Sequence, residues 1–339
     1  MKPVTILAIE SSCDETSASV CVDGKILSNF IANQIVHEQY GGVVPELASR
    51  AHIQNIVPVV DKAIKEASST HHSPLTIHNI DAIAFTQAPG LIGSLLVGTQ
   101  FAKSLALSLN KPLIAVHHMQ AHVLANLIDE NNKPDFPFLC LTVSGGHTQI
   151  VLAKSPLELE VIGQTIDDAA GEAFDKSAKL LGLPYPGGPL IDQYAKLGNP
   201  LAFKFAEPQI PELNFSFSGL KTSILYFLQK QEAGFIENNL NDLCASIQYT
   251  IVNILLKKVK KAVQQTGIKQ ICIAGGVSAN SGLRTALEEM GKKHGWKTFI
   301  PKFEYCTDNA AMIAITAYYK YQANEFCELN VNPSARAEW

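Results

Sequence analysis

The chain has 339 residues, of which 47% are hydrophobic and 17% charged, and its formal net charge is −4. This balance is typical of a folded globular chain, and the length is enough to bury one large core or two medium ones. The small negative charge excludes a basic footprint over the whole chain, so any contact with nucleic acid must be local. The clearest basic cluster, KKVKK at residues 257–261, is best explained as a solvated turn near the end of a helix.

The sequence carries neither a recognisable targeting signal nor a cysteine motif. Its first residues, MKPVTILAIE, contain only a short apolar run, and no uninterrupted apolar run reaches the length of a membrane span. We therefore expect a cytoplasmic protein with no membrane contact. The seven cysteines are an odd number without a C-x-x-C pair, which favours reduced thiols over a disulfide framework or a cysteine zinc site.

The N-terminal third is expected to begin as a β-meander and to continue with alternating helices and strands. Apolar runs predict strands at residues 4–9, 18–22 and 26–31. Between the first two lies the polar turn ESSCDET at residues 10–16, which can face a phosphate, although an ordinary solvated hairpin is an equal alternative. The pattern that follows predicts, in order, a helix at 53–67, a strand at 82–86, a helix at 94–109 and a strand at 113–116.

Two histidines in VHHMQAHVLANL, residues 116–127, are the first candidates for metal chemistry. His118 and His122 are four residues apart, so they fall on one face of a helix and can hold one divalent transition metal. Asp308, just before the alanine-rich helical run 310–319, is the expected third ligand. For the pair alone, two ordinary polar residues of an amphipathic helix are the alternative. A metalloprotease helix would carry Glu directly after its first His, and Met119 stands there instead.

The second half of the chain repeats the pattern of the first. NNKPDFP, residues 131–137, is polar and contains prolines, which predicts a boundary. After it, residues 138–165 again read as strand, small polar turn, strand, turn and strand, which indicates an internal duplication. The turn is now SGGH, residues 144–147, whose glycines can bring backbone N–H groups onto an anion, with a tight hairpin as the alternative.

Towards the C-terminus the pattern predicts helices at 169–181 and 243–264, with a glycine-rich loop at 183–189 between them. A fully apolar strand near residue 270 then runs into Gly275 and Gly276, and a helix opens after Asn280. This order lets a flat base or a phosphate press against the backbone near a helix N-terminus. A short strand at 297–300 precedes the helix of Asp308, and the tail 332–339 is expected to be frayed.

The two phosphate-type turns and the adenosine-type turn described above occur in the order typical of one α/β fold. This is the actin-like, Hsp70-like and sugar-kinase-like (ASKHA) fold, in which two duplicated α/β lobes enclose a nucleotide cleft. Ten motifs sharpen this likeness: IESSCDET, GGVVPELASRAH, APGLIGSLLVG, VHHMQAH, VSGGHTQ, DDAAGEAFDK, YPGGP, NFSFSGLKT, AGGVSAN and CTDNAAM. Together, over residues 4–317, they resemble the bacterial form of the universal tRNA N6-adenosine threonylcarbamoyltransferase family.

The resemblance implies a domain organisation and a reaction. The first lobe would span residues 1–132 and the second 133–317, with a C-terminal helix at about 318–339 packing back on the first. The enzyme would be an acyltransferase that moves the threonylcarbamoyl group from threonylcarbamoyl-AMP to N6 of adenosine 37. The tRNAs would be those that read codons beginning with A, and AMP would be released.

The resemblance also assigns residues. His118, His122 and Asp308 match the family's ligands for one divalent metal, Fe²⁺ ahead of Zn²⁺. The positions that match or flank the adenylate substrate are Thr142, Val143, Ser144, Gly145, Gly146, Asp175, Gly188, Asp192, Gly275, Gly276 and Asn280. Some archaeal-type relatives have a tyrosine ligand where this chain has Thr142, so a tyrosine in the coordination sphere is not expected here.

The attacking nitrogen must lose a proton, and Asp14 or Glu15 in ESSCDET is our hypothesis for the residue that receives it. The family implies tRNA as a partner, together with a degenerate paralogue (TsaB) and a small ATPase (TsaE). The alternative to this reading is an actin-fold kinase or ATPase that acts on a small molecule. A non-catalytic scaffold is the third class.

Overall fold

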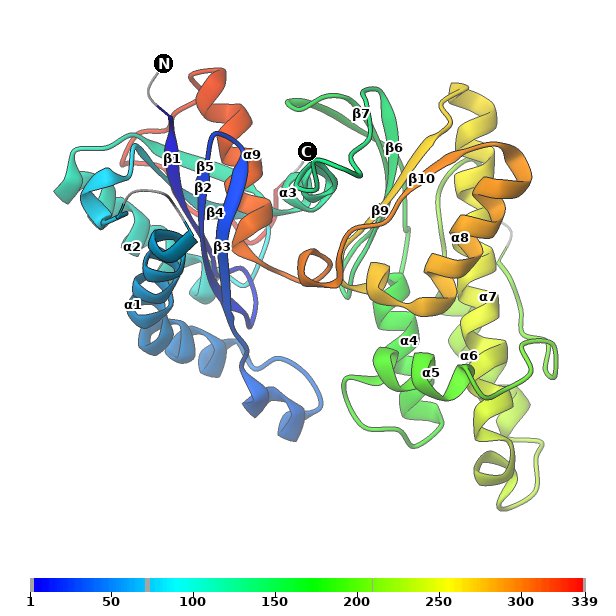
Figure 1. Cartoon of the computed structure of the whole chain (residues 1–339). Coiled ribbons are helices and arrows are strands. Elements are labelled where there is room, and N and C mark those ends of the chain that lie inside the picture. Colours follow the sequence, from blue (N-terminus) through cyan, green and yellow to red (C-terminus); the bar gives the residue numbers. More distant parts are fainter. Residues whose placement is uncertain (1–2, 71–73, 209, 338–339) are drawn as a thin grey trace. The chain divides into compact units, whose positions relative to one another are not determined.

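The computed structural model describes residues 3–70, 74–208 and 210–337, which form two compact units (Figure 1). Unit 1 comprises the described residues up to Lys133, residues 155–159 and those from Lys302 onward. Unit 2 comprises residues 134–154 and 160–301. Each unit contains one of the two five-stranded sheets.

The sheet of unit 1 has the strand order β3-β2-β1-β4-β5. The β1–β2 and β2–β3 pairs are antiparallel, whereas β4 lies parallel to both β1 and β5. The strands are β1 Thr5–Glu10, β2 Thr16–Val22, β3 Lys25–Ala32, β4 Ala82–Ala88 and β5 Leu113–His117. The helices of this unit are α1 Pro45–Thr70, α2 Ile92–Leu109, α3 His118–Leu124 and α9 Ala310–Gln322. The predicted meander and the predicted βαβ segment are both present.

Both faces of the unit 1 sheet are covered, because side chains alternate between them along each strand. Leu7 and Ile9 of β1 join a buried cluster with α1 and α2. Ile6 and Ala8 point the other way and join a second cluster with α9. Figure 1 shows α1 and α9 on opposite faces of this sheet. β1 is therefore apolar on both faces, as its continuous apolar run predicts.

The sheet of unit 2 has the order β10-β9-β6-β7-β8. Its strands, taken in chain order, correspond to β1–β5 of unit 1, and read from the other end, as β8-β7-β6-β9-β10, the two sheets have the same order. Again the first two strands are antiparallel, and the later strands are parallel to the first. The strands are β6 Phe138–Val143, β7 Thr148–Ser155, β8 Glu158–Gln164, β9 Gln270–Ala274 and β10 Lys297–Phe299. This repeated order is what an internal duplication predicts.

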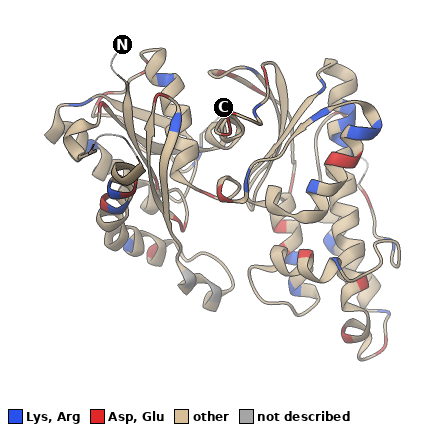
Figure 2. Ribbon diagram, viewed as in Figure 1, with Lys and Arg blue, Asp and Glu red and all other residues tan. Residues whose placement is uncertain are grey.

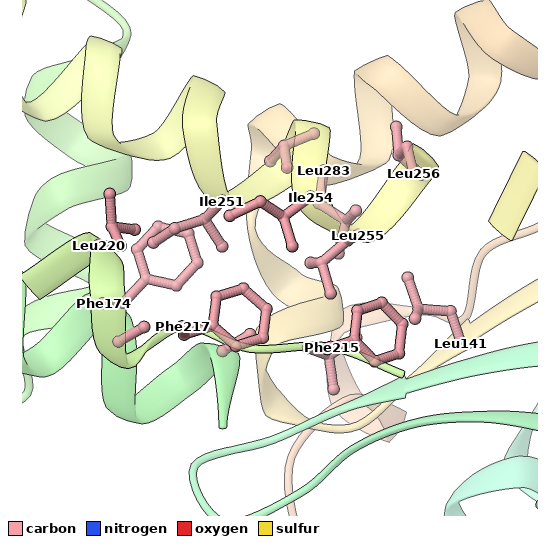
Figure 3. Packing of buried hydrophobic residues seen from close by; sticks show 14 of the residues in the cluster. Leu141, Phe174, Phe215, Phe217, Leu220, Ile251, Ile254, Leu255, Leu256 and Leu283 are labelled. Atoms are coloured by element: carbon pink, nitrogen blue, oxygen red, sulfur yellow. The ribbon is translucent and has the colours of Figure 1, made fainter. Parts of the chain in front are cut away.

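One face of the unit 2 sheet packs on helices through the largest hydrophobic cluster (Figure 3). Leu141 of β6 and the buried rings of Phe215 and Phe217 lie against Ile251 and Leu255 of the long helix. The helices of this unit are α4 Ala170–Leu180, α5 Gly187–Ala195, α6 Ser218–Leu228, α7 Phe235–Thr266 and α8 Ser281–His294. α4, α7 and α8 include the predicted helical segments.

Residues 302–317 were predicted to belong to the second lobe, but in the structure they lie in unit 1. They belong to unit 1, because every residue of α9 from Ala310 to Ala317 is buried, and α9 packs on that unit's sheet. The helix also ends at Gln322 and does not continue towards the C-terminus. The tail beyond it pairs with unit 1: Cys327 N donates to Leu113 O at 2.9 Å, and Ser334 N to Gln87 O at 3.1 Å.

Among the helices of the described residues, α2 has the length and hydropathy of a membrane span. Its inner face, with Leu95, Thr99 and Ala102, is buried against the rest of unit 1. Core helices of folded domains share that length and hydropathy, so the finding is weak evidence for a membrane segment.

The charged side chains lie mainly on helices, and the strands carry few (Figure 2). The basic cluster at 257–261 lies inside α7, one turn before its end at Thr266, and it is not simply solvated. Lys257 pairs with Glu207, while Lys258 Nζ donates to the carbonyls of Ile210 and Glu212 at 2.6 and 2.8 Å. These contacts tie part of the cluster to residues that precede α6, while the Lys257 side chain stays 66% exposed.

Candidate functional site

Unit 1 brings together the three predicted metal ligands, which we call the metal group: His118, His122 and Asp308. The two histidines lie on the short helix α3, directly after β5, with their ring centroids 4.7 Å apart. Asp308 Oδ1 lies 3.3 Å from His118 Nε2 and 3.1 Å from His122 Nε2. One donor atom from each residue lies within 4.8 Å of the other two, so a single ion can reach all three.

The start of α9 fixes Asp308. The N-cap is Asn309, whose Oδ1 accepts from Met312 N at 3.1 Å. Ala310 N donates to Ser17 Oγ at 2.9 Å, which ties the helix start to β2. Asn309 therefore takes the cap, and the Asp308 carboxylate is left to face the two imidazoles.

The chemistry of the donor set fits a divalent ion. Both Nε2 atoms face the same oxygen of Asp308, so without an ion each imidazole must carry a proton there. Burial alone would raise the pKa of Asp308, but His118 and His122 hold it well below its ordinary value. Burial alone would lower the pKa of His118, but Asp308 and Glu10 raise it well above its ordinary value. Positive charge is thus favoured at this point, and a divalent ion would supply it in place of protons.

The polar turn after β1 lies beside the metal group. Ser12 Oγ is 3.3 Å from His118 Nδ1 and 3.5 Å from Asp308 Oδ2. Asp14 and Glu15 follow in the same turn and are partly buried. Burial and the negative charges of Asp308 and Asp14 raise the pKa of Glu15 well above its ordinary value. The two predicted proton acceptors are therefore in the same unit as the metal group.

Sequence reasoning missed the residues that hold this turn. His52 of α1 is fully buried, its Nε2 donates to Cys13 O at 2.9 Å, and Thr16 Oγ1 donates to its Nδ1 at 2.8 Å. Burial lowers the pKa of His52, which keeps it neutral and suited to this donor and acceptor pair. Glu10 was also missed, although a single carboxylate at the end of an apolar strand was a signal that could have found it.

In unit 2 the predicted substrate positions start at the carboxyl ends of two parallel strands. Thr142 of β6 lies opposite Ala274 of β9, so Val143 and Gly275 come next to each other. Gly275 has φ +84°, and a Cβ there would lie 2.4 Å from Val143 O. Only glycine fits at this position. Carboxyl ends of parallel strands are a common place for ligands in α/β folds.

The glycine loop, Ser144 to His147, follows β6 and is closed by its own hydrogen bonds. Ser144 N donates to His147 O at 2.8 Å, and His147 N to Ser144 Oγ at 3.1 Å. Gly145 and Gly146 are exposed, and a Cβ on either would meet nothing within 4 Å. The protein's own packing therefore does not require glycine there, which leaves close approach of a ligand to the backbone as a reason.

Helix α4 begins against the glycine loop and carries Asp175. Gly171 N donates to Ser144 O at 3.2 Å. One turn later, Asp175 Oδ1 accepts from Gly187 N at 2.9 Å and Gly188 N at 3.1 Å, at the start of α5. Burial raises the pKa of Asp175. The carboxylate thus links α4 to the glycine-rich turn, and one of its oxygens is already used in that link.

Asp192 and Asn280 meet at the start of α8. Asp192 Oδ1 accepts from Ser281 N at 3.1 Å and from Ser281 Oγ at 2.7 Å. Asn280 Oδ1 caps the helix by accepting from Leu283 N at 2.9 Å, and its Nδ2 donates to Gln248 Oε1 at 2.6 Å. Both polar atoms of the Asn280 amide therefore have protein partners. No local pattern marks Gln248, which reaches this point from α7.

All eleven predicted substrate positions lie in unit 2, and the metal group with Asp14 and Glu15 lies in unit 1. Each unit thus gathers its own set of predicted residues. Gly188, which the sequence predicts in a loop at 183–189, lies instead in α5, which begins at Gly187.

Comparisons with known proteins identify a family. The model of the family "tRNA N6-adenosine threonylcarbamoyltransferase" (TsaD) matches residues 25–315. A relative of that name from Christiangramia forsetii is 62% identical over 338 residues, 98% of each chain. One from Porphyromonas gingivalis is 57% identical and covers 99% of this chain and 98% of its own. One from Clostridium botulinum strain Kyoto is 50% identical, over 97% and 96% of the two chains.

Solved structures with low sequence identity share the fold. HypF in its phosphate- and nucleotide-bound form has a TM-score of 0.62 at 15% identity, over 96% of this chain. The chain spans 47% of that protein, about half its length. Component A of (R)-2-hydroxyglutaryl-CoA dehydratase from Acidaminococcus fermentans has a TM-score of 0.54 at 15% identity, over 94% and 99% of the chains. These likenesses concern the fold alone, and they confirm the expected actin-like ASKHA architecture.

Proposed function

This chain belongs to the tRNA N6-adenosine threonylcarbamoyltransferase family, and we propose that it transfers threonylcarbamoyl from threonylcarbamoyl-AMP to N6 of adenosine 37 in tRNA. The tRNAs are those that read codons beginning with A, and AMP is released. The observation that carries the proposal is the 62% identity, along 98% of the chain, to a relative named for this activity. A small-molecule kinase or ATPase of the same fold is not favoured, because the family match runs through both units.

The metal group is the proposed place for one divalent ion. His118, His122 and Asp308 would hold it, and this set of two nitrogens and one oxygen suits Fe²⁺ and Zn²⁺ alike. We propose Fe²⁺ as the resident ion. When bound, such an ion supplies a Lewis acid for charge on the carbamoyl oxygen.

The residues of unit 2 are proposed to bind the adenylate. The glycine loop would receive the phosphate through backbone N–H groups, which is supported by the open space at Gly145 and Gly146. Gly276 likewise has open space where a side chain would lie, which supports close approach of the adenosine. Asp175 and Asp192 are proposed to accept hydrogen bonds from ribose hydroxyls. In both residues Oδ1 already accepts hydrogen bonds within the protein, so Oδ2 would be the acceptor for the ribose. Asn280 is proposed to shape this pocket by holding the start of α8.

In the proposed reaction, N6 of adenosine attacks the carbamoyl carbon of a mixed anhydride. A C–N bond forms, the C–O bond to the phosphate breaks, and AMP departs with that bond's electron pair. N6 loses one proton, which we assign to Glu15 or Asp14. Burial and the neighbouring carboxylates raise the pKa of Glu15, which makes it a stronger base than a solvent-exposed carboxylate. Because AMP is a good leaving group, the chain's main task is to position both reactants.

The proposal extends to partners and location. We propose tRNA and threonylcarbamoyl-AMP as the substrates, and a degenerate paralogue (TsaB) and a small ATPase (TsaE) as helper proteins. We propose that the two units act as the two lobes of the fold, with residues 302–317 in the first, and that the protein works in the cytoplasm without a membrane contact.

A substrate test separates the candidate functions. The protein, with its helper proteins, is incubated with threonylcarbamoyl-AMP or with ATP, each with and without a tRNA that has adenosine at position 37. The proposal predicts that the adenylate is consumed and modified tRNA appears only when that tRNA is present. Consumption of ATP by this chain alone, without the helper proteins and with no modified tRNA, would favour the kinase or ATPase, and turnover of neither compound would favour a scaffold.

A further inference from the structure

Glu10, the last residue of β1, is a buried carboxylate that the proposed reaction does not use. It is fully buried, and in the register of the sheet it lies opposite Ser17 of β2. A charged group in such a place is costly unless it is well hydrogen-bonded. Its partners therefore indicate what it is for.

Three donors surround the Glu10 carboxylate. Ser12 N donates to Oε1 at 2.5 Å, and Thr86 Oγ1 donates to Oε2 through a short hydrogen bond. His118 Nδ1 lies 3.2 Å from the same Oε2. Thr86 comes from β4, where Phe85 pairs with Ile9, so the sheet itself places its hydroxyl beside Glu10. The backbone N–H and the hydroxyl hold one oxygen each, which fixes Oε2 towards the imidazole.

We propose that Glu10 is a positioning residue for His118. By accepting the proton on Nδ1, it fixes the tautomer and the ring orientation, and the lone pair of Nε2 is left to face His122 and Asp308. Carboxylates commonly orient metal-binding histidines in this way. The inference rests on the metal centre proposed above, and it adds a residue outside that set of three.

The second histidine of the metal group has no such partner. His122 Nδ1 is buried, and within the described part of the chain it has no hydrogen-bond partner, while its Nε2 faces Asp308 at 3.1 Å. The orienting carboxylate therefore serves one ligand of the two. A substitution at Glu10 should lower the metal affinity by disturbing His118, while His122 and Asp308 keep their positions.

A purely structural role for Glu10 makes a different prediction. If Glu10 only caps the turn through Ser12 N, its removal lowers the free energy of unfolding but leaves the metal affinity of the folded protein unchanged. If it positions His118, the affinity itself falls. The comparison must therefore be made on folded protein at equal concentration.

The test measures zinc affinity by competition with a chelator in the parent and in Glu10→Gln. With the glutamine oxygen accepting from Ser12 N, its NH2 group faces His118 Nδ1 and donates where the Glu10 carboxylate accepts, so it cannot hold the proton on Nδ1. We expect the affinity to fall by roughly 10- to 100-fold. The matched control is Ser19→Ala, which removes another buried polar group of the same sheet, one that donates to Ser28 O at 2.7 Å. The control should keep the parent's affinity.

Two outcomes would overturn the inference. Folded Glu10→Gln with the parent's zinc affinity would overturn it alone, whereas a parent that binds no zinc would overturn the proposed metal centre as well. A second measurement holds even if Glu10→Gln does not fold. In the zinc-loaded parent labelled with ¹⁵N-histidine, the inference predicts a proton on Nδ1 of His118 and zinc on Nε2, and zinc on Nδ1 would contradict it.

Discussion

The metal group of unit 1 is built from side chains, whereas the loops of unit 2 offer their backbone. His118 and His122 are buried, and the cap at Asn309 leaves Asp308 free to face them. Gly145 and Gly146 instead leave open space where side chains would lie. We therefore expect metal binding in unit 1 to be most sensitive to substitutions that remove a ligand side chain. We expect unit 2 to be most sensitive to substitutions that add a side chain to a glycine.

The largest expected effect comes from Asp308→Ala, which removes the oxygen that both imidazoles face. We expect loss of the bound metal and a fall in transfer of about a thousandfold, because an ion at the reacting carbonyl supplies several kcal/mol. The protein should remain folded, since the N-cap of α9 is Asn309. Metal analysis and a transfer assay on the same preparation check this. Full activity without bound metal would contradict it.

Gly275→Ala tests the backbone of unit 2 through stability. The new Cβ would lie 2.4 Å from Val143 O at a φ of +84°, so we expect a loss of about 2–4 kcal/mol in the free energy of unfolding. Chemical denaturation measures it. The neighbouring Gly276→Ala is the matched control, because its Cβ would meet nothing within 4 Å. Equal losses in the two variants would contradict the described packing.

Gly146→Ala tests the same unit through binding. Because the Cβ enters open space, stability should change by less than about 0.5 kcal/mol. If the loop receives the phosphate of the adenylate, the added methyl group should raise the KM for threonylcarbamoyl-AMP on the order of tenfold, about 1.4 kcal/mol. Steady-state kinetics measure this. An unchanged KM would remove the loop from the adenylate site.

Asp175→Asn gives the smallest effect and concerns pH. Burial raises the pKa of Asp175 in the folded chain above its ordinary value of 3.8. The folded state therefore holds this proton more tightly, so the group contributes stability below pH 3.8 that is lost as the pH rises through the folded pKa. Asparagine keeps the acceptor for Gly187 and Gly188 but does not titrate.

The measurement for Asp175→Asn is the difference in unfolding free energy between the parent and the variant at several pH values. Relative to the variant, the parent should lose stability as the pH rises from about 4, by about 1 kcal/mol or less. A parent that gains stability over this range would show that the folded pKa is lowered instead.

Local patterns were enough to predict much of the fold and to place most of the candidate residues on its strands, turns and helices. The spacing of His118 and His122 predicts one helical face, and Asp308 precedes a helix that its alanine-rich pattern predicts. The glycine pairs follow apolar strands, so their places at strand ends could be predicted as well. The repeated order of strands and turns predicts the duplication that the two sheets show.

Contacts between distant segments could not be predicted in this way. The assignment of α9 to unit 1 depends on which sheet its apolar face covers, and the helix pattern alone does not contain that information. His52 and Gln248 contact residues more than thirty positions away, so no local spacing marks them. The place of Glu10 at the end of an apolar strand marks the residue but does not show its contact with His118. Asn280 lies where the motif predicts, but the structure shows that its amide is used within the protein.

The most direct test of the central claim is the X-ray absorption spectrum of the protein loaded with one equivalent of zinc. The account predicts imidazole scattering from two histidines and oxygen ligands, with zinc–nitrogen distances of about 2.0–2.1 Å. His118→Ala and His122→Ala should each lose part of the imidazole signal. Sulfur ligands, or an imidazole signal that survives in both variants, would contradict the claim that His118, His122 and Asp308 hold the ion.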